Sequence, residues 1–198
     1  MATDKLFLDY STHSPDAMAR LVRAEADDYE AKSITFKAIE KQTDIFLIGR
    51  SGQRVVLIET QGYKKEKMYC DMLLKVVLYC FQNEYRGSIE VAAIFLEEAH
   101  AHAAQQFFEQ QFGGSSLLHF TPKIFIFSRI KEDELRALDD IHLTPLYPLC
   151  DLSQTEVEQS IPKWAEQIKT ASDITVEERQ QLLSFLAGAV SHRIKSIL

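Results

Sequence analysis

The chain has 198 residues, which is enough for one sizeable domain or for a core with a small helical extension. Hydrophobic residues make up 46% and charged residues 26% of the sequence, an ordinary globular composition that argues against intrinsic disorder. The formal net charge of −7 disfavours a protein that coats nucleic acid through general positive charge. It leaves room for an enzyme that has an acidic, metal-binding centre and a local basic rim.

Neither a secretion signal nor a membrane span is expected. The segment 1–5 lacks a basic region followed by an apolar core, and no apolar run approaches the ~20 residues that a span needs. Cys70, Cys80 and Cys150 have no paired spacing and form no CxxC or CxH cluster for zinc. We therefore expect a cytoplasmic protein with free thiols, of which Cys70 and Cys80 are buried in an apolar helix.

The first half of the chain combines one helix, a run of strands and a second, longer helix. Ser14 caps the first helix, Pro15 lies in its first turn, and the helix ends near residues 27–28. The Gly-containing turn at residues 50–53 joins two apolar strands into a hairpin. The expected strands are residues 33–39, 43–49, 54–61 and 88–97. The expected long helix is residues 65–82.

The second half is expected to be mainly helical. Gly113 and Gly114 end a helix over 100–111, and the sequence from Ile141 is an extended, Pro-marked segment. Capping residues begin the two closing helices, and Pro162 predicts a break or a second start in the first of them. The other expected elements are a strand over 122–130, a short helix over 132–139, and closing helices over 153–170 and 175–195.

This order predicts an α/β protein with an αβββαβ core, in which helices flank a mixed central sheet. We expect residues 1–150 to form the core and residues 151–198 a helical extension packed on it. The last helix carries a wide apolar stripe that serves either core packing or a homodimer surface. The stripe consists of Leu182, Leu183, Phe185, Leu186, Ala189, Val190 and Ile194.

Polar residues continue the buried face of the strand 54–61. Because alternate residues of a strand share a face, Glu59 and Gln61 lie on the side of Val55 and Leu57. Antiparallel pairing through the turn is expected to place Asp44 near Glu59 or Gln61, with the position opposite residue 44 at about residue 59. Oxygen ligands in a partly open pocket suit Mg²⁺ or Mn²⁺. Acids at strand ends are also common solvated decoration, so both interpretations stay open.

Nearby cations and one aromatic residue fit either interpretation. Lys64, Lys65 and Lys67 follow the strand and can meet a phosphate backbone or mark a solvated helix start. Lys75 and Tyr79 are four residues apart, so they share one face of the long helix and can point at the acidic site. Tyr79 can equally be an aromatic edge of the core. No histidine is assigned a role.

Four segments together resemble the PD-(D/E)XK nuclease superfamily, and within it the recombination-promoting nuclease/putative transposase (Rpn) group. The resemblance covers roughly residues 1–130. The segments are Asp4-Lys-Leu-Phe, Lys41-Gln-Thr-Asp44, Val56-Leu-Ile-Glu59-Thr-Gln61 and Lys75-Val-Val-Leu-Tyr79.

The resemblance implies a restriction-endonuclease-like domain that hydrolyses DNA phosphodiester bonds with a metal-activated water. Asp44 and Glu59 would be the metal ligands, and Gln61 would stand where most of the superfamily has lysine. Since an amide is neutral, Lys75 or one of the lysines at 64–67 would have to compensate. Lys75 itself stands where the group often has arginine and lacks the bidentate phosphate fork.

The leading hypothesis is a Mg²⁺-dependent DNA endonuclease of the recombination or transposase-associated type. A homodimer is one option for it, because two sites would then face two antiparallel strands. The alternatives are a catalytically weak or inactive binding or regulatory module, and a phosphohydrolase for another substrate. The acid on the first helix stays open among Asp4, Asp9, Glu25 and Glu30. A metal ion between Asp44 and Glu59 would establish the site; a water-free salt bridge or an outward-facing Glu59 would argue against it.

Overall fold

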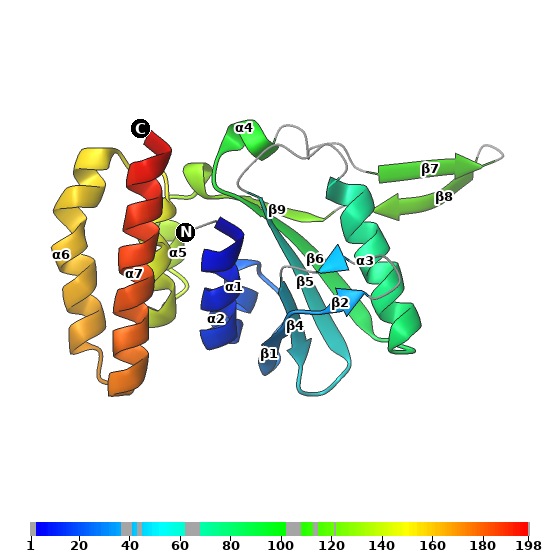
Figure 1. The fold of residues 1–198 in the computed structure, drawn as a ribbon, viewed down its shortest axis with the longest axis horizontal. Helices are drawn as coiled ribbons and strands as arrows, with labels where there is room; N and C mark the ends of the chain where they lie inside the picture. The colour runs from blue at the N-terminus through cyan, green and yellow to red at the C-terminus, as the bar shows by residue number, and fades with distance from the viewer. Residues whose placement is uncertain are drawn as a thin grey trace.

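The chain folds as an α/β protein with a five-stranded mixed sheet, helices on both faces and a C-terminal helical pair (Figure 1). This confirms the predicted fold class. The computed structural model describes the backbone of residues 3–36, 41–42, 45–61, 68–101, 108–112, 115–120 and 122–197. It describes the side chains of residues 5–34, 45–61, 68–101 and 122–194. In the described residues, no helix has both the length and the apolar character that crossing a membrane requires.

The strand β5 lies at the centre of the sheet, whose order is β1-β4-β5-β6-β9. It pairs antiparallel with β4 and parallel with β6. Gly52 supports the turn before it, because its φ of +70° is one that glycine adopts without strain. The strands of this sheet are β1 (Tyr29–Lys32), β4 (Ile45–Gly49), β5 (Arg54–Gln61), β6 (Ser88–Phe95) and β9 (Lys123–Ile126).

Alternate residues of β5 serve two hydrophobic clusters, one on each face of the sheet. Val55 and Leu57 pack under α3, whereas Val56 and Ile58 pack on the side of α1 and α2. The predicted period of two along this strand is therefore confirmed. The α-helices are α1 (Thr3–His13), α2 (Pro15–Leu21), α3 (Met68–Gln82), α4 (Glu98–Ala101), α5 (Glu132–Arg136), α6 (Gln154–Thr170) and α7 (Val176–Ile197).

The helices α6 and α7 form an outer layer over α1 (Figure 1). The ring of Tyr10 in α1 meets that of Phe185 in α7 edge-on, with 5.4 Å between centroids. The buried Trp164 of α6 and Leu182 of α7 belong to the same cluster as the side chains under α1. Core packing therefore accounts for much of the apolar stripe on α7.

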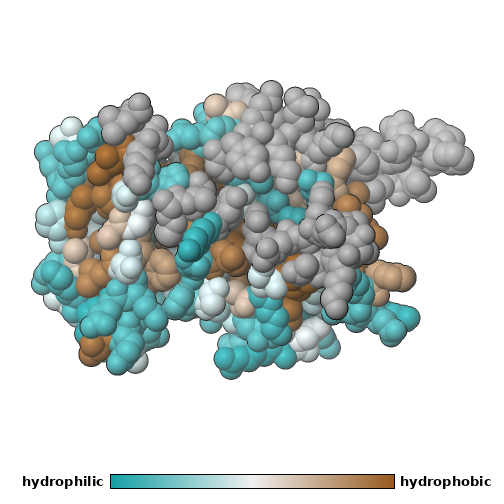
Figure 2. Space-filling model, viewed as in Figure 1, coloured by the Kyte–Doolittle hydropathy of each residue, from teal (hydrophilic) through white to brown (hydrophobic). Residues whose placement is uncertain are grey.

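The rest of the α7 stripe borders a groove between α6 and α7. Leu183, Val190 and Ile194 line it together with Ile161 and Ala165 of α6, and its volume is about 510 Å³. Figure 2 shows this region as a brown band between hydrophilic surfaces.

Several expected boundaries near the N-terminus are wrong. The helix that begins at Pro15 ends at Leu21, because Arg23 turns into the left-handed region (φ +50°) and the N–H of Ala24 caps the carbonyl of Ala19. The helix α1 was not predicted; tertiary packing of its buried side chains holds it. The first strand of the sheet is β1, whereas β2 (Thr35–Phe36) pairs with β3 (Lys41–Gln42) in a sheet of their own.

Two further differences come from glycine and proline. The expected helix over 100–111 is wrong at its end, because β7 (Phe108–Phe112) pairs with β8 (Ser115–Phe120) across a Gly-Gly connection. The segment Ile141–Leu149 is a 3₁₀-helix, η3, since the φ that proline imposes also suits this helix.

The expectations for Pro162 and two cysteines are also corrected. The helix α6 runs through Pro162 without a break. The ring of Pro162 is exposed, so the carbonyl that it leaves unbonded can meet water, while buried side chains hold the opposite face. All three cysteines are free, but Cys70 is exposed and Cys80 half-buried; only Cys150 is buried. Because the sheet covers only the inner face of α3, Cys70 faces outward.

A cluster of Arg20, Asp140 and His142 joins α2 to the segment that supports the C-terminal helices. Asp140 accepts hydrogen bonds from Arg20 Nη1 at 2.6 Å and from the His142 backbone at 3.0 Å. Burial alone would raise the pKa of Asp140, but these partners hold it below its usual range. The hydrogen bond between Asp140 and the His142 ring raises the pKa of His142.

Stability should therefore depend on pH through His142. A raised folded-state pKa gives a contribution that is complete below the unfolded value of ~6.5 and is lost as pH rises through the folded value. Urea unfolding should show wild-type protein losing stability from pH 6 to pH 8.5, and His142→Gln losing clearly less. The exposed His13→Gln should behave like wild type, and parallel curves for all three proteins would contradict the assignment.

Candidate functional site

The polar end of β5 lies inside the protein, on the face that α3 covers. The exposed fraction is 2% for Glu59 and 3% for Gln61. Their neighbours on the parallel strand β6 are Ala93 and Phe95, which offer no hydrogen-bonding side chain. The carboxylate therefore finds no partner on β6, and an isolated buried charge is strongly destabilising.

Lys75 of α3 provides that partner. Its ammonium group donates a hydrogen bond to Glu59 Oε2, and both side chains are at most 4% exposed. The chain leads from β5 into α3 and then into β6, so the crossover itself carries Lys75 back over the strand. The predicted approach of Lys75 to the acidic strand is confirmed.

Tyr79 lies one turn further along the same face of α3. Its ring stacks on Phe46 of β4, with 4.9 Å between centroids and 20° between planes, and meets Tyr85 edge-on. Burial raises the pKa of its hydroxyl, which the charge of Lys32 partly offsets. The structure thus places Tyr79 in aromatic packing with Phe46 and Tyr85, one helical turn after Lys75.

Two buried polar atoms near this end of the sheet have no hydrogen-bond partner in the described part of the chain: Gln61 Oε1 and the hydroxyl of Tyr69. Tyr69 lies in the first turn of α3, and burial raises its pKa to about 12, so it stays a neutral donor at physiological pH. The sequence analysis missed Tyr69, whose only signal is its place in the first turn after the strand. A buried amide oxygen is costly to leave unpaired, and an oxygen-seeking cation or water would satisfy it.

Residues 3–196 match the family described as protein of unknown function, DUF2887. The chain belongs to this family. Neither the curated proteins nor the solved structures contain a match to it.

Four predicted site residues of this DUF2887 protein, Asp44, Lys64, Lys65 and Lys67, lie outside the described residues. The described register of β4 with β5 ends at Ile45 opposite Ile58, one residue short of Glu59. Among the residues described, no group of three or more His, Cys, Asp or Glu side chains could hold a metal ion.

The donor set at the end of β5 partly suits a hard cation. Glu59 supplies a carboxylate and Gln61 an amide oxygen on the same side of the strand. Lys75 already neutralises the charge of Glu59, so a cation would have to share the carboxylate with the ammonium group. Two oxygen-bearing side chains hold a divalent ion only with further ligands, for which Asp44 is the sequence candidate.

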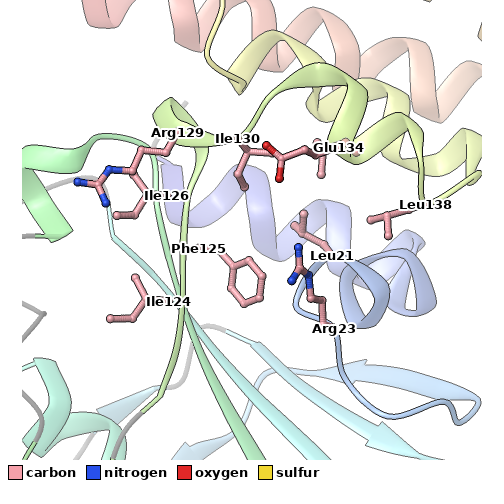
Figure 3. A pocket seen from close by; sticks show the side chains of 10 residues that line it. Leu21, Arg23, Ile124, Phe125, Ile126, Arg129, Ile130, Glu134 and Leu138 are labelled. Carbon is pink, nitrogen blue, oxygen red and sulfur yellow. The ribbon is translucent and has the colours of Figure 1, made fainter.

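A separate cavity of about 410 Å³ opens beside the edge strand β9 (Figure 3). Its walls are mainly apolar side chains of α2, β9 and α5. Of its charged residues, Arg129 pairs with Glu98, and Glu134 accepts a hydrogen bond from the backbone of Lys131. It contains none of the predicted site residues.

The buried pair allows a direct test on the DUF2887 protein. Lys75→Met should lower the free energy of unfolding by about 3–5 kcal/mol, because it leaves a buried carboxylate unpaired. Denaturant unfolding of Lys75→Met, Glu59→Gln and the double variant measures the effect.

The double variant should recover most of the loss, since it removes the charge together with its partner. Simple additivity of the two single effects would contradict the coupling between Glu59 and Lys75.

Proposed function

We propose that this protein is a metal-dependent DNA endonuclease of the recombination-promoting, transposase-associated type, which works in the cytoplasm. The observation that carries the proposal is the buried Glu59–Lys75 pair beside Gln61, at the end of the central strand of an α/β fold. An acid, an amide oxygen and a lysine then converge where the resemblance to PD-(D/E)XK nucleases expects acid and lysine.

In the proposed site, Glu59 and Asp44 would hold Mg²⁺ or Mn²⁺, and the Gln61 amide oxygen would be available as a further ligand. When bound, the ion supplies Lewis-acid stabilisation of the phosphate and a water of lowered pKa. Lys75 replaces the missing strand lysine from the neighbouring helix. Its ammonium group, fixed by Glu59, orients a water and stabilises negative charge that develops on the phosphate.

The DNA backbone would approach the basic segment that joins β5 to α3. Lys64, Lys65 and Lys67 are the proposed phosphate contacts, and this local basic rim offsets the net charge of −7. Cleavage of both DNA strands would use two sites, so a homodimer is part of the proposal.

One observation favours a second candidate, a binding or regulatory module without catalysis. The direct salt bridge between Lys75 and Glu59 is the arrangement that argues against a metal site, because it neutralises the buried carboxylate without a cation. The pair can therefore serve as a purely structural link between β5 and α3.

The endonuclease proposal predicts that purified protein nicks supercoiled plasmid in Mg²⁺ or Mn²⁺, and that Glu59→Gln lowers the rate by at least ~100-fold. The exposed Glu166→Gln, on α6, should keep the wild-type rate. Gel analysis of initial rates measures the effect.

Equal cleavage by wild type and Glu59→Gln would overturn the assignment of the site. Calorimetric titration with Mn²⁺ separates the two candidates: micromolar binding that is lost in Asp44→Ala supports the enzyme, whereas a lack of binding to wild-type protein supports the structural module.

A further inference from the structure

The helix α3 has an outer face that is apolar and open to solvent. Its exposed residues are Cys70, Leu74, Val77 and Phe81, followed by Gln82 at its end. The exposed fraction is 54% for Val77 and 82% for Phe81, a large value for an aromatic side chain without a polar group. We call the row of Cys70, Leu74, Val77 and Phe81 the α3 stripe.

Charge is nearly absent from α3. Asp71 and Lys75 are its only charged residues over Met68–Gln82, and Lys75 points inward to Glu59. A helix that is apolar on all sides is normally covered on all sides. The sheet covers the inner face of α3, whereas no described element covers its outer face.

We infer that the α3 stripe is the contact surface of a homodimer, in which α3 of one copy packs antiparallel on α3 of the other. The inference takes from the proposed function only the expectation of two copies, and the surface is argued from α3 itself.

The spacing of the stripe suits a second copy of the same helix. The intervals of four, three and four residues are those of a coiled-coil seam, and they read identically in both directions. Two antiparallel copies related by a twofold axis then place Cys70 opposite the Phe81 of the other copy, and Leu74 opposite Val77.

Charge also favours a second copy over nucleic acid. The stripe has no cation to meet a phosphate, so nucleic acid gains little from it. A contact face without acids keeps the repulsion between two copies of a chain with a net charge of −7 small at the interface. The α3 stripe is such a face.

The ribbon of β7 and β8 gives the interface additional extent. In the described part of the chain these strands pair only with each other, and Figure 1 shows them extending outward at the end of the molecule that carries α3. A two-stranded ribbon alone is marginally stable in water. The 15 residues of α3 span only about 22 Å, too short for the ~800 Å² that each partner contributes to a standard interface, so the proposed dimer needs a further element such as this ribbon.

Sedimentation equilibrium without DNA or metal tests the surface. Wild-type protein should be a dimer at micromolar concentration, and Phe81→Glu should raise the dissociation constant by at least ~100-fold, because each dimer loses two buried rings and gains two acids. Val176→Glu is the matched control, since Val176 is 58% exposed at the start of α7, and it should dimerise like wild type. Circular dichroism confirms that both variants are folded.

Cys70 provides a second measurement on unaltered protein. Its modification by a maleimide should slow at least tenfold between dilute and concentrated samples. Three results would each overturn the inference. They are a wild-type protein that stays monomeric at 100-fold above micromolar concentration, a Phe81→Glu variant that is fully dimeric, and a dimer in which maleimide modifies Cys70 as fast as in the monomer. Wild-type protein that dimerises but does not cleave plasmid defeats only the proposed function.

Discussion

The buried contact between Glu59 and Lys75 fixes how α3 lies on the sheet. An apolar helix can slide over an apolar sheet at small cost, because many packings bury similar areas. A carboxylate that must meet one particular ammonium group removes that freedom, since any other placement leaves two buried charges apart. The position of α3 then determines which of its residues face the sheet and which face outward.

The same constraint connects the two faces of α3. The inner face carries Lys75, Met72 and Tyr79 onto β5 and β4, and the outer face presents the α3 stripe. Both faces belong to one helix, so a partner that shifted α3 would also shift Lys75 relative to Glu59.

Local sequence patterns were sufficient to predict the elements whose tertiary surroundings favour the same local structure. The alternation in β5, the turn at Gly52 and the capping box of Thr175 with Glu178 were all readable, and the structure has each of them. The α1 helix could not be predicted from the sequence, because the few side chains that tertiary packing buries stand among many polar residues. The bond between Asp140 and Arg20, 120 residues apart, has no local signal at all.

The placement of α7 over α1 bears on how the protein is made. Tyr10 packs against Phe185, and its hydroxyl donates to the backbone of His142. The first helix therefore lacks its full surroundings until the chain has been synthesised through α7. Folding from the N-terminus during synthesis would leave apolar surface open for most of that time. This architecture favours a chain that completes its core in one late, cooperative step and depends on protection from aggregation until then.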